Sequence, residues 1–413
     1  MNIFIKNKNF RKFSLASMLS SAGDILFYLA LMTYASKLKN YSLALSLIAI
    51  SESIPKILDS VGGYLADRTK NKFKNLVLFA VIRFLLYLTV GILFAQNING
   101  WNLVMIVIVI NFISDLIGSY SGGLQTPVIV NIVGVDEVAE ANGFTGGVNQ
   151  IISMIAQFVG SGLLLFMSYS SLAIVNAFTF LAAGMLFGLV GLQTKKDIAI
   201  TEQPTINQQG YFSTMLDAFK QVKKAKGLMT TVLTLALLNG ILGSIEPLIS
   251  IVTAGSRKTM IVFNYSFTIA LIGATLACGM ALGSIVGPQV FKKTSLIMLS
   301  VVASVICIIT AIVVLLKNIF FIMPVLFVLG VTVGTINPKL TQWLVTTVDR
   351  TILSSSIGLL NTILLIITPI MTTIFTTISG IFNINYALYA VLFTACIILL
   401  ITLNLLRQKK EAI

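Results

Sequence analysis

The sequence predicts an all-α integral membrane protein in which twelve transmembrane helices form two six-helix, pseudo-symmetric halves. Of the 413 residues, 57% are hydrophobic and only 10% are charged, whereas a soluble domain carries about a quarter charged residues. The apolar residues form long runs separated by short basic segments. The net charge of +14 is therefore spread as membrane topology requires, not gathered as a nucleic-acid surface. This composition excludes a soluble hydrolase or a nucleic-acid binder.

Twelve apolar runs are long enough to span a bilayer, which takes about twenty helical residues. They lie near 13–36, 43–66, 76–96, 102–124, 144–168, 172–193, 228–252, 261–290, 294–316, 319–345, 355–380 and 384–406. No alternation of period two indicates a β-barrel. One long polar stretch divides the runs six and six. We therefore expect an N-terminal half at 1–193, a cytoplasmic central loop at 194–227 and a C-terminal half at 228–413.

The distribution of Lys and Arg predicts that both termini are cytoplasmic. Twenty of the 28 basic residues fall in the predicted inner segments and five in the outer ones, as expected when basic loops stay inside. The central loop also has apolar residues at helical spacing, which predict an amphipathic helix on the inner leaflet. These are Tyr211, Phe212, Met215, Phe219 and Val222. A solvated linker is the alternative.

The segment between the second and third runs resembles a known loop. It reads Gly62-Gly63-Tyr64-Leu65-Ala66-Asp67-Arg68-Thr69-Lys70-Asn71-Lys72-Phe73-Lys74. This is similar to the cytoplasmic loop between helices 2 and 3 of the major facilitator superfamily, written G-x-L-a-D-r-x-g-r-k. The stretch Pro127–Gly143 adds to the resemblance, and Pro127 and Asp136 have weak counterparts at Pro338 and Asp349 in the second half. Such half-to-half repeats are typical of secondary transporters.

The resemblance implies a major facilitator fold, a transporter and not an enzyme, with helices 1, 4, 7 and 10 around a central cavity. It also implies a conformational role for the loop residues Gly62, Gly63, Asp67, Arg68 and Lys72. In the family the loop acid caps a helix of the opposite half, which here corresponds to the start of the eleventh run near 354–356. Within the superfamily, Ser21-Ala22-Gly23-Asp24, Pro55, the loop and Ala141-Asn142 resemble the macrolide-efflux and enterobactin-exporter branch.

Three acids inside the runs are candidates for binding protons or substrate: Asp24, Asp115 and Glu246. A charge at membrane depth is costly and faces a partner or a water-filled cavity. No base lies within four residues of Asp24; a structural salt bridge is its alternative role. Glu246 precedes Pro247, whose missing N–H bends the helix, so it suits a gate or a proton carrier.

Two intramembrane ion pairs are also expected. Glu52 and Lys56 are four residues apart and can neutralise each other on one helix face. Asp59, Arg83 and Asp115 lie at similar distances from the cytoplasmic ends of their runs. One arginine between two acids predicts an interhelical clamp that breaks when the halves rock.

Other chemistry is not indicated. The chain has no histidine, its three cysteines lie inside apolar runs, and no P-loop is present, so we expect no metal, no cofactor and no nucleotide-driven transport. Gly160-Ser161-Gly162 lacks the proline of the family's antiporter helix. Lys339 follows Pro338 near the inner surface and is expected to snorkel.

The resemblance and the acids together predict a bacterial inner-membrane antiporter. Its expected partners are protons, the lipid bilayer and a small amphiphilic substrate of the drug, macrolide or siderophore kind. A monomer that binds no nucleic acid is expected. A nutrient importer of the same fold is the first alternative, and a membrane receptor or scaffold that transports nothing is the second. The intramembrane acids argue against a scaffold, which has no use for them.

Overall fold

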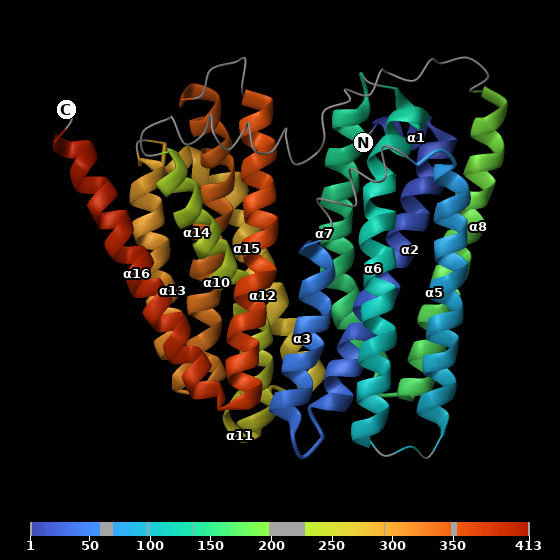
Figure 1. Ribbon diagram of the computed structural model, residues 1–413, viewed down its shortest axis with the longest axis horizontal. Helices are drawn as coiled ribbons and strands as arrows, with labels where there is room; N and C mark the ends of the chain where they lie inside the picture. Colours follow the sequence, from blue (N-terminus) through green and yellow to red (C-terminus); the bar gives the residue numbers. More distant parts are fainter. Residues whose placement is uncertain are drawn as a thin grey trace. The chain divides into compact units, whose positions relative to one another are not determined.

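The computed structural model describes residues 2–57, 69–96, 98, 100–134, 136–197, 228–292, 294–347 and 353–411. In these residues every regular element is a helix (Figure 1). The first half has α1 (Asn2–Lys6), α2 (Lys8–Ala35), α3 (Tyr41–Ile57), α5 (Lys72–Ala95), α6 (Gly100–Val133), α7 (Val138–Leu163) and α8 (Tyr169–Asp197). The second has α10 (Leu228–Gly255), α11 (Arg257–Met260), α12 (Tyr265–Val290), α13 (Leu296–Leu315), α14 (Ile319–Thr347), α15 (Leu353–Ile381) and α16 (Ile384–Glu411).

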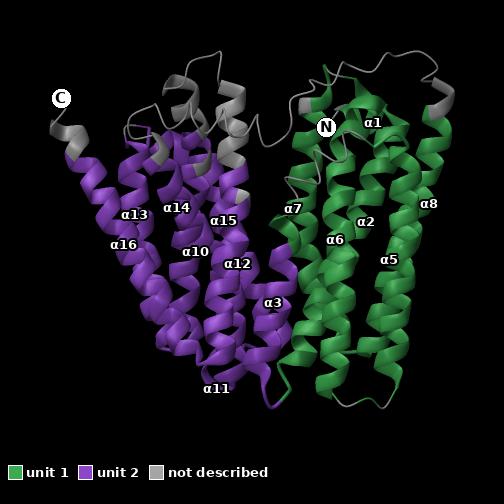
Figure 2. Cartoon of the chain, in the orientation of Figure 1, with its two compact units in different colours: residues 1–38, 55–207 green, residues 39–54, 208–413 purple. Residues whose placement is uncertain are grey.

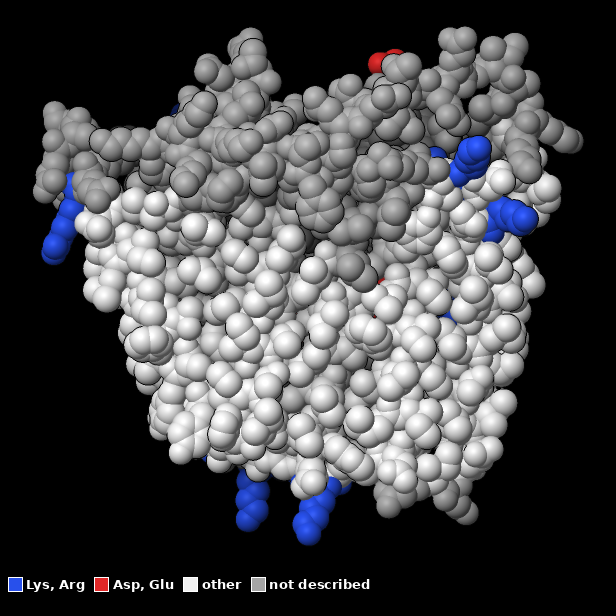
Figure 3. Space-filling view, in the orientation of Figure 1, with Lys and Arg blue, Asp and Glu red and all other residues white. Residues whose placement is uncertain are grey.

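Ten helices of the described residues are long and apolar enough to cross a membrane, which confirms the all-helical membrane fold. The remaining two long helices are α3, described over 17 residues, and α7. The glycine and amide residues of α7 lower its hydropathy; they include Gly146, Gly147, Asn149 and Gln157. On the face drawn in Figure 3, Lys and Arg side chains stand out at the two ends and uncharged residues cover most of the band between them.

Two helix ends differ from the predicted ends of the apolar runs. Helix α6, which corresponds to the fourth predicted run, continues through Pro127 to Val133, nine residues past the predicted end at 124. Residues 261–264, which were predicted to be helical, instead separate α11 from α12, and Asn264 caps α12 by accepting the N–H of Phe267. The predicted ends were wrong here because polar residues at a membrane surface keep helical hydrogen bonds, so apolarity marks the hydrocarbon and not the helix.

The chain forms two compact units (Figure 2). Unit 1 contains Met1–Leu38 and Pro55–Asn207, and unit 2 contains Lys39–Ile54 and Gln208–Ile413. Residues 39–54, which the sequence assigns to the first half, thus pack with unit 2. Ser42 donates its hydroxyl hydrogen to the carbonyl of Ser379 at 2.9 Å, and Gly380 leaves just enough room for the side chain of Ser46.

The helix packing repeats between the units. In unit 1, α2 packs on α7 and α8, and α5 packs on α6 and α8. In unit 2, α10 packs on α15 and α16, and α13 packs on α14 and α16. These are the same pairings in the same chain order, so each unit repeats one arrangement of helices. This agrees with the weak sequence repeat and with the inverted or parallel repeats of transporter folds.

The two cores are packed differently. One end of unit 1 has a cluster of large apolar side chains that includes Phe10, Phe13, Leu124 and Phe187. Unit 2 instead brings α12 and α14 into backbone contact, because Gly283 and Gly334 have no side chain. A Cβ on Gly283 would lie 2.1 Å from the carbonyl oxygen of Val331. Small residues at such crossings allow close van der Waals packing in a membrane.

Candidate functional site

The centre of unit 1 holds a buried ion pair. Arg83, the twelfth residue of α5, directs its Nη2 at both carboxylate oxygens of Asp24 on α2, at 2.7 and 2.8 Å. The side chain of Arg83 is 7% exposed and that of Asp24 is 34% exposed. Both residues lie well inside helices that can span the membrane. An ion pair at this depth is costly to form unless its remaining donors and acceptors are satisfied.

Other groups hold the guanidinium of Arg83. Its Nε donates to Ser114 Oγ at 2.8 Å and its Nη1 to Ser20 Oγ at 3.3 Å. The guanidinium carbon lies 3.9 Å from the ring centroid of Phe180 on α8, a cation–π contact. Gly118 on α6 packs against the guanidinium, because a Cβ built there would lie 3.6 Å from it, at ordinary van der Waals contact. Arg83, on α5, is therefore held by groups from three other helices, α2, α6 and α8.

A second acid belongs to the same network. Asp115, next to Ser114, accepts a hydrogen bond from the Asn111 amide at 2.7 Å, and Tyr87 donates to the Asn111 carbonyl oxygen at 2.7 Å. The charge of Asp115 also acts on Arg83. Tyr87 is one turn after Arg83 and stacks on Phe180 at 5.4 Å. Asp115 is thus the last acceptor of a hydrogen-bond chain from Tyr87 through Asn111, and its neighbour Ser114 accepts from Arg83.

The predicted partner of Arg83 needs a correction. The sequence suggested Asp59 or Asp115, whereas the ion pair that the structure describes is with Asp24. Asp59 lies outside the described residues. Asp24 has no base within four residues on its own helix, as expected, but α5 supplies one, so a deep acid without a nearby counter-charge was the wrong description. Arg83 does form an interhelical ion pair, and Asp115 contributes its charge to that site.

The candidate acid on α10, Glu246, has different surroundings. Glu246 is half-buried on α10, and its backbone carbonyl accepts the hydroxyl of Ser250 at 2.8 Å. Around it α10 and α15 are joined through small polar groups: Asn239 donates to Thr368 Oγ1 at 2.9 Å, and Ser244 lies 3.3 Å from Thr372 Oγ1. Pro247 lies within α10, as predicted. The role of Glu246 stays a prediction.

The other predicted residues are placed only in part. Glu52 is half-buried and Lys56 exposed, one turn apart on α3; their ion pair stays a prediction. Lys72 begins α5 and donates to the carbonyl of Thr69 at 2.9 Å. The loop residues Gly62, Gly63, Asp67 and Arg68, and the amphipathic segment predicted at 211–222, lie outside the described residues.

Lys339 does not snorkel. It is 8% exposed on α14, and its ammonium donates to the carbonyls of Phe291 and Thr294, beyond the end of α12. The last carbonyls of a helix have no partner within the helix and carry partial negative charge. Lys339 therefore caps α12. Among the described residues no group of three His, Cys, Asp or Glu side chains could hold a metal ion.

Several residues of the site were not predicted. Ser114 accepts a hydrogen bond from Arg83, Asn111 donates one to Asp115, and Gly118 packs against the guanidinium. A signal for them exists in the sequence. Asn111, Ser114, Asp115 and Gly118 recur at positions i, i+3, i+4 and i+7 in an otherwise apolar run, which is the spacing of one helix face. A polar or small face on an apolar helix indicates a protein-facing or water-facing surface.

Solved structures with this arrangement of helices are transporters with varied substrates. A bacterial homologue of the human lysosomal transporter Spinster, in an inward-facing and unoccupied conformation, has a TM-score of 0.63 at 12% identity, with 96% of this chain and 95% of that chain covered. A bacterial homologue of the iron transporter ferroportin gives 0.67 at 11% identity, over 96% and 98%. The nucleoside transporter NupG gives 0.62 at 14%, over 96% and 99%. Identities this low show a common fold only.

The sequence itself gives the family. No protein of curated function matches the chain in sequence. The sequence profile of the Major Facilitator Superfamily matches residues 14–371, which contain Asp24, Arg83, Asp115 and Glu246 and most of both units. The multi-pass helical fold, the repeated helix packing and this match lead to one conclusion: the chain belongs to the Major Facilitator Superfamily of membrane transporters.

Proposed function

We propose that this chain is a proton-coupled antiporter that exports amphiphilic small molecules across a bacterial inner membrane, with both termini in the cytoplasm. The observation that supports this best is the unequal burial of the central ion pair. Asp24 is about one third exposed, whereas Arg83 is almost completely buried. The acid is therefore the partner that a proton or a ligand can reach.

Arg83 can tolerate the loss of Asp24 as a charged partner. It keeps two hydrogen bonds to serine hydroxyls, the ring of Phe180 and the charge of Asp115. An arginine does not lose its proton in a protein. A change of charge at this site therefore takes place on a carboxylate. In our proposal Asp24 either takes up a proton or pairs with a cationic group of the substrate, and Arg83 stays in place.

Competition between a proton and a substrate for one carboxylate couples their movements. When the substrate favours the unprotonated acid, its binding releases a proton, and the two are carried in opposite directions by a change between two conformations. A membrane potential is worth about 2.3 kcal/mol per net charge moved per 100 mV, so it helps to drive export of a neutral substrate, whereas exchange of one monovalent cation for one proton is driven by the pH difference alone. A neutral or cationic amphiphile of the drug or macrolide kind fits a partly exposed acid inside an apolar helical unit. Glu246 is the candidate for a second proton-binding acid.

Transport by purified protein in proteoliposomes tests the proposal. A vesicle with an acidic lumen should accumulate a lipophilic cation such as tetraphenylphosphonium, or a macrolide, when protein and gradient are both present. The double variant Asp24→Asn/Glu246→Gln should lose this accumulation. Asp136→Asn, which neutralises an exposed acid in the turn after α6, is the matched control and should transport normally.

The direction of the gradient separates the alternatives. Accumulation driven by an acidic exterior would indicate proton symport and hence an importer. Transport that survives unchanged in the double variant would overturn the roles of both acids. A chain that moves none of the probes under either gradient would fit a receptor or scaffold.

A further inference from the structure

Unit 1 has a polar pocket that is separate from the Asp24–Arg83 pair. Its volume is about 770 Å³ and it lies where α1, the first turns of α2, the start of α7 and the end of α8 meet. Three lysines, two glutamates and three amide side chains line it. No step of the proposed transport uses these groups.

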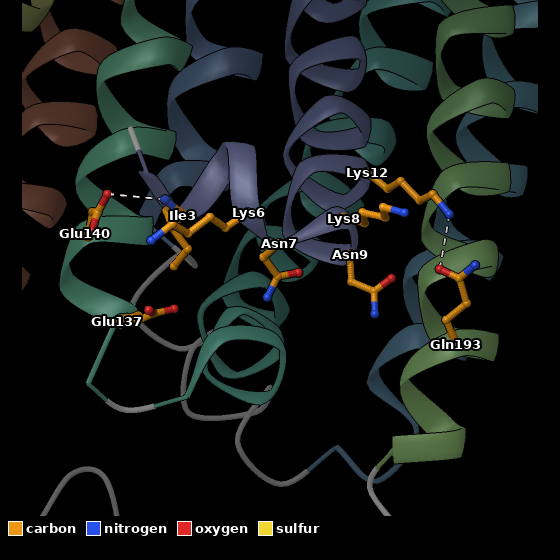
Figure 4. A pocket seen from close by; sticks show the side chains of 9 residues that line it. All are labelled: Ile3, Lys6, Asn7, Lys8, Asn9, Lys12, Glu137, Glu140 and Gln193. Atoms are coloured by element: carbon orange, nitrogen blue, oxygen red, sulfur yellow. Dashed lines mark hydrogen bonds between the residues drawn. The ribbon is translucent and has the colours of Figure 1, made fainter.

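The charges in the pocket are separated. Figure 4 shows Lys6 beside Glu137 and Glu140 at one end, and Lys8 and Lys12 at the other. Asn9 and Gln193 lie at the same end as Lys8 and Lys12. The first end therefore carries one positive and two negative charges. The second end has no acid among its lining residues and carries two positive charges one helical turn apart.

Hydrogen-bond donors gather at this basic end. Lys12 donates its ammonium hydrogen to Gln193 Oε1 at 3.1 Å, which leaves the NH₂ group of Gln193 as a donor. Lys8 is exposed and has no ion-pair or hydrogen-bond partner among the described residues. Asn7 caps α2 by accepting the N–H of Phe10, so the first two N–H groups of α2, on Lys8 and Asn9, have no intrahelical acceptor. Ammonium, amide and backbone donors around one space favour a phosphate oxygen.

Exposed apolar side chains continue from the basic end into the membrane. Leu15 is 42% exposed and follows Lys12 by three residues on α2. Leu189 is 48% exposed and precedes Gln193 by four residues on α8, which packs against α2. Each leucine is therefore on the face of its helix that carries the polar group, one turn nearer the apolar core. Polar groups at the membrane surface with exposed leucines one turn deeper match a lipid, whose headgroup lies at the surface and whose acyl chains lie in the apolar core.

We propose that the basic end of this pocket binds the phosphate group of an anionic phospholipid. Lys8 and Lys12 neutralise the phosphate, Asn9 and Gln193 donate hydrogen bonds to it, and the acyl chains lie against Leu15 and Leu189. The bound lipid bridges the start of α2 to the end of α8. It thereby stabilises the packing of these two helices at the end of unit 1 that contains α1.

Lipid binding to the purified full-length protein in detergent tests this site. Native mass spectrometry and thermal unfolding would compare phosphatidylglycerol with phosphatidylcholine of the same acyl chains. Wild type should prefer phosphatidylglycerol and be stabilised by it. The variant Lys8→Gln/Lys12→Gln should bind phosphatidylglycerol about tenfold more weakly, a loss of about 1.4 kcal/mol. The control Lys39→Gln/Lys258→Gln removes two other exposed lysines and should behave as wild type.

Two further arms make the outcome decisive. Inorganic phosphate and glycerol phosphate are added without lipid. If they stabilise wild type but not Lys8→Gln/Lys12→Gln, the site binds phosphate, but its ligand is a soluble phosphate compound and not a lipid. The single variant Lys8→Gln guards against misfolding, since Lys8 is exposed and has no described partner to lose. Equal preference for phosphatidylglycerol in wild type and in both Lys8 variants, or no preference in wild type together with no effect of phosphate, would overturn the proposal.

Discussion

Units 1 and 2 repeat one arrangement of helices but differ in how they accommodate a buried acid. Asp24 is the seventeenth residue of α2, and Glu246 is the nineteenth residue of α10, the helix that takes the corresponding place in unit 2. Arg83 is the twelfth residue of α5, and the twelfth residue of the corresponding α13 is Cys307. The sequence of α13 contains no charged residue at all. Packing has therefore been kept between the units, while the base at this place, Arg83, has an uncharged counterpart in unit 2.

This difference indicates how each unit holds its helices together. Unit 1 uses a charged network that joins α2, α5, α6 and α8 through Arg83. Unit 2 uses backbone contact between α12 and α14 at its glycines, and hydroxyl contacts between α10 and α15. A charged network can change with protonation or ligand binding, whereas glycine packing has no such response. We therefore expect the units to respond differently to matched substitutions.

The largest effect is expected at Arg83. Arg83→Ala leaves Asp24 and Asp115 without their base, and removing one partner of a buried pair costs roughly 3–5 kcal/mol. The double variant Arg83→Met/Asp24→Asn should recover part of this loss, because it removes both charges. Cys307→Ala, at the corresponding place in unit 2, should cost about 1 kcal/mol. Thermal and denaturant unfolding of the purified proteins measure these changes. If the double variant is no more stable than Arg83→Ala, the pair is not the reason for the loss.

The second effect concerns the glycine packing of unit 2. In Gly283→Ala the new Cβ would lie 2.1 Å from the carbonyl oxygen of Val331, so α12 and α14 must move apart. Overpacking of this kind costs typically 1–3 kcal/mol. Gly122→Ala in unit 1 is the control, because a Cβ there meets nothing within 4 Å. A comparison of melting temperatures in the same detergent would show the difference; equal losses would mean that backbone contact does not stabilise unit 2.

A smaller effect is expected at Lys339. Lys339→Met keeps the apolar stem and removes the ammonium that caps α12, at a cost of about 1 kcal/mol. Lys292→Met removes an exposed charge near the same end of α12 and should change the unfolding free energy much less. Hydrogen exchange of the last turn of α12 is the most local measurement. No faster exchange in Lys339→Met than in Lys292→Met would contradict the cap.

The sequence predicted the fold class and some members of the site, but not their pairing. Runs of apolar residues and the loop at Gly62–Lys74 were enough for the helical membrane fold. The cost of a buried charge singled out Asp24, Arg83 and Asp115. The partner of Arg83 was missed because depth was counted from the ends of apolar runs, while α5 begins four residues before its run, at Lys72. Ser17, Ser20 and Asp24 mark one face of α2 at helical spacing, but the spacing does not show which neighbouring helix that face meets.

Lys339 was misjudged for a related physical reason. The ammonium of a lysine near a predicted membrane surface can be stabilised in two ways: by hydrogen bonds to water, or by hydrogen bonds to the free carbonyls of a helix end. Choosing between them requires knowing that α12 ends beside α14, at Phe291 and Thr294. That is a contact between segments almost fifty residues apart. No local pattern in the sequence contains this information.

The central claim is that Asp24 changes its partner while Arg83 remains fixed. The most direct test is proton release on ligand binding by purified protein in lightly buffered detergent solution. Addition of tetraphenylphosphonium should release protons from wild type and from Asp136→Asn, because the cation favours the unprotonated acid. Asp24→Asn should bind the cation more weakly and release fewer protons per cation bound. Undiminished proton release from Asp24→Asn would contradict the account.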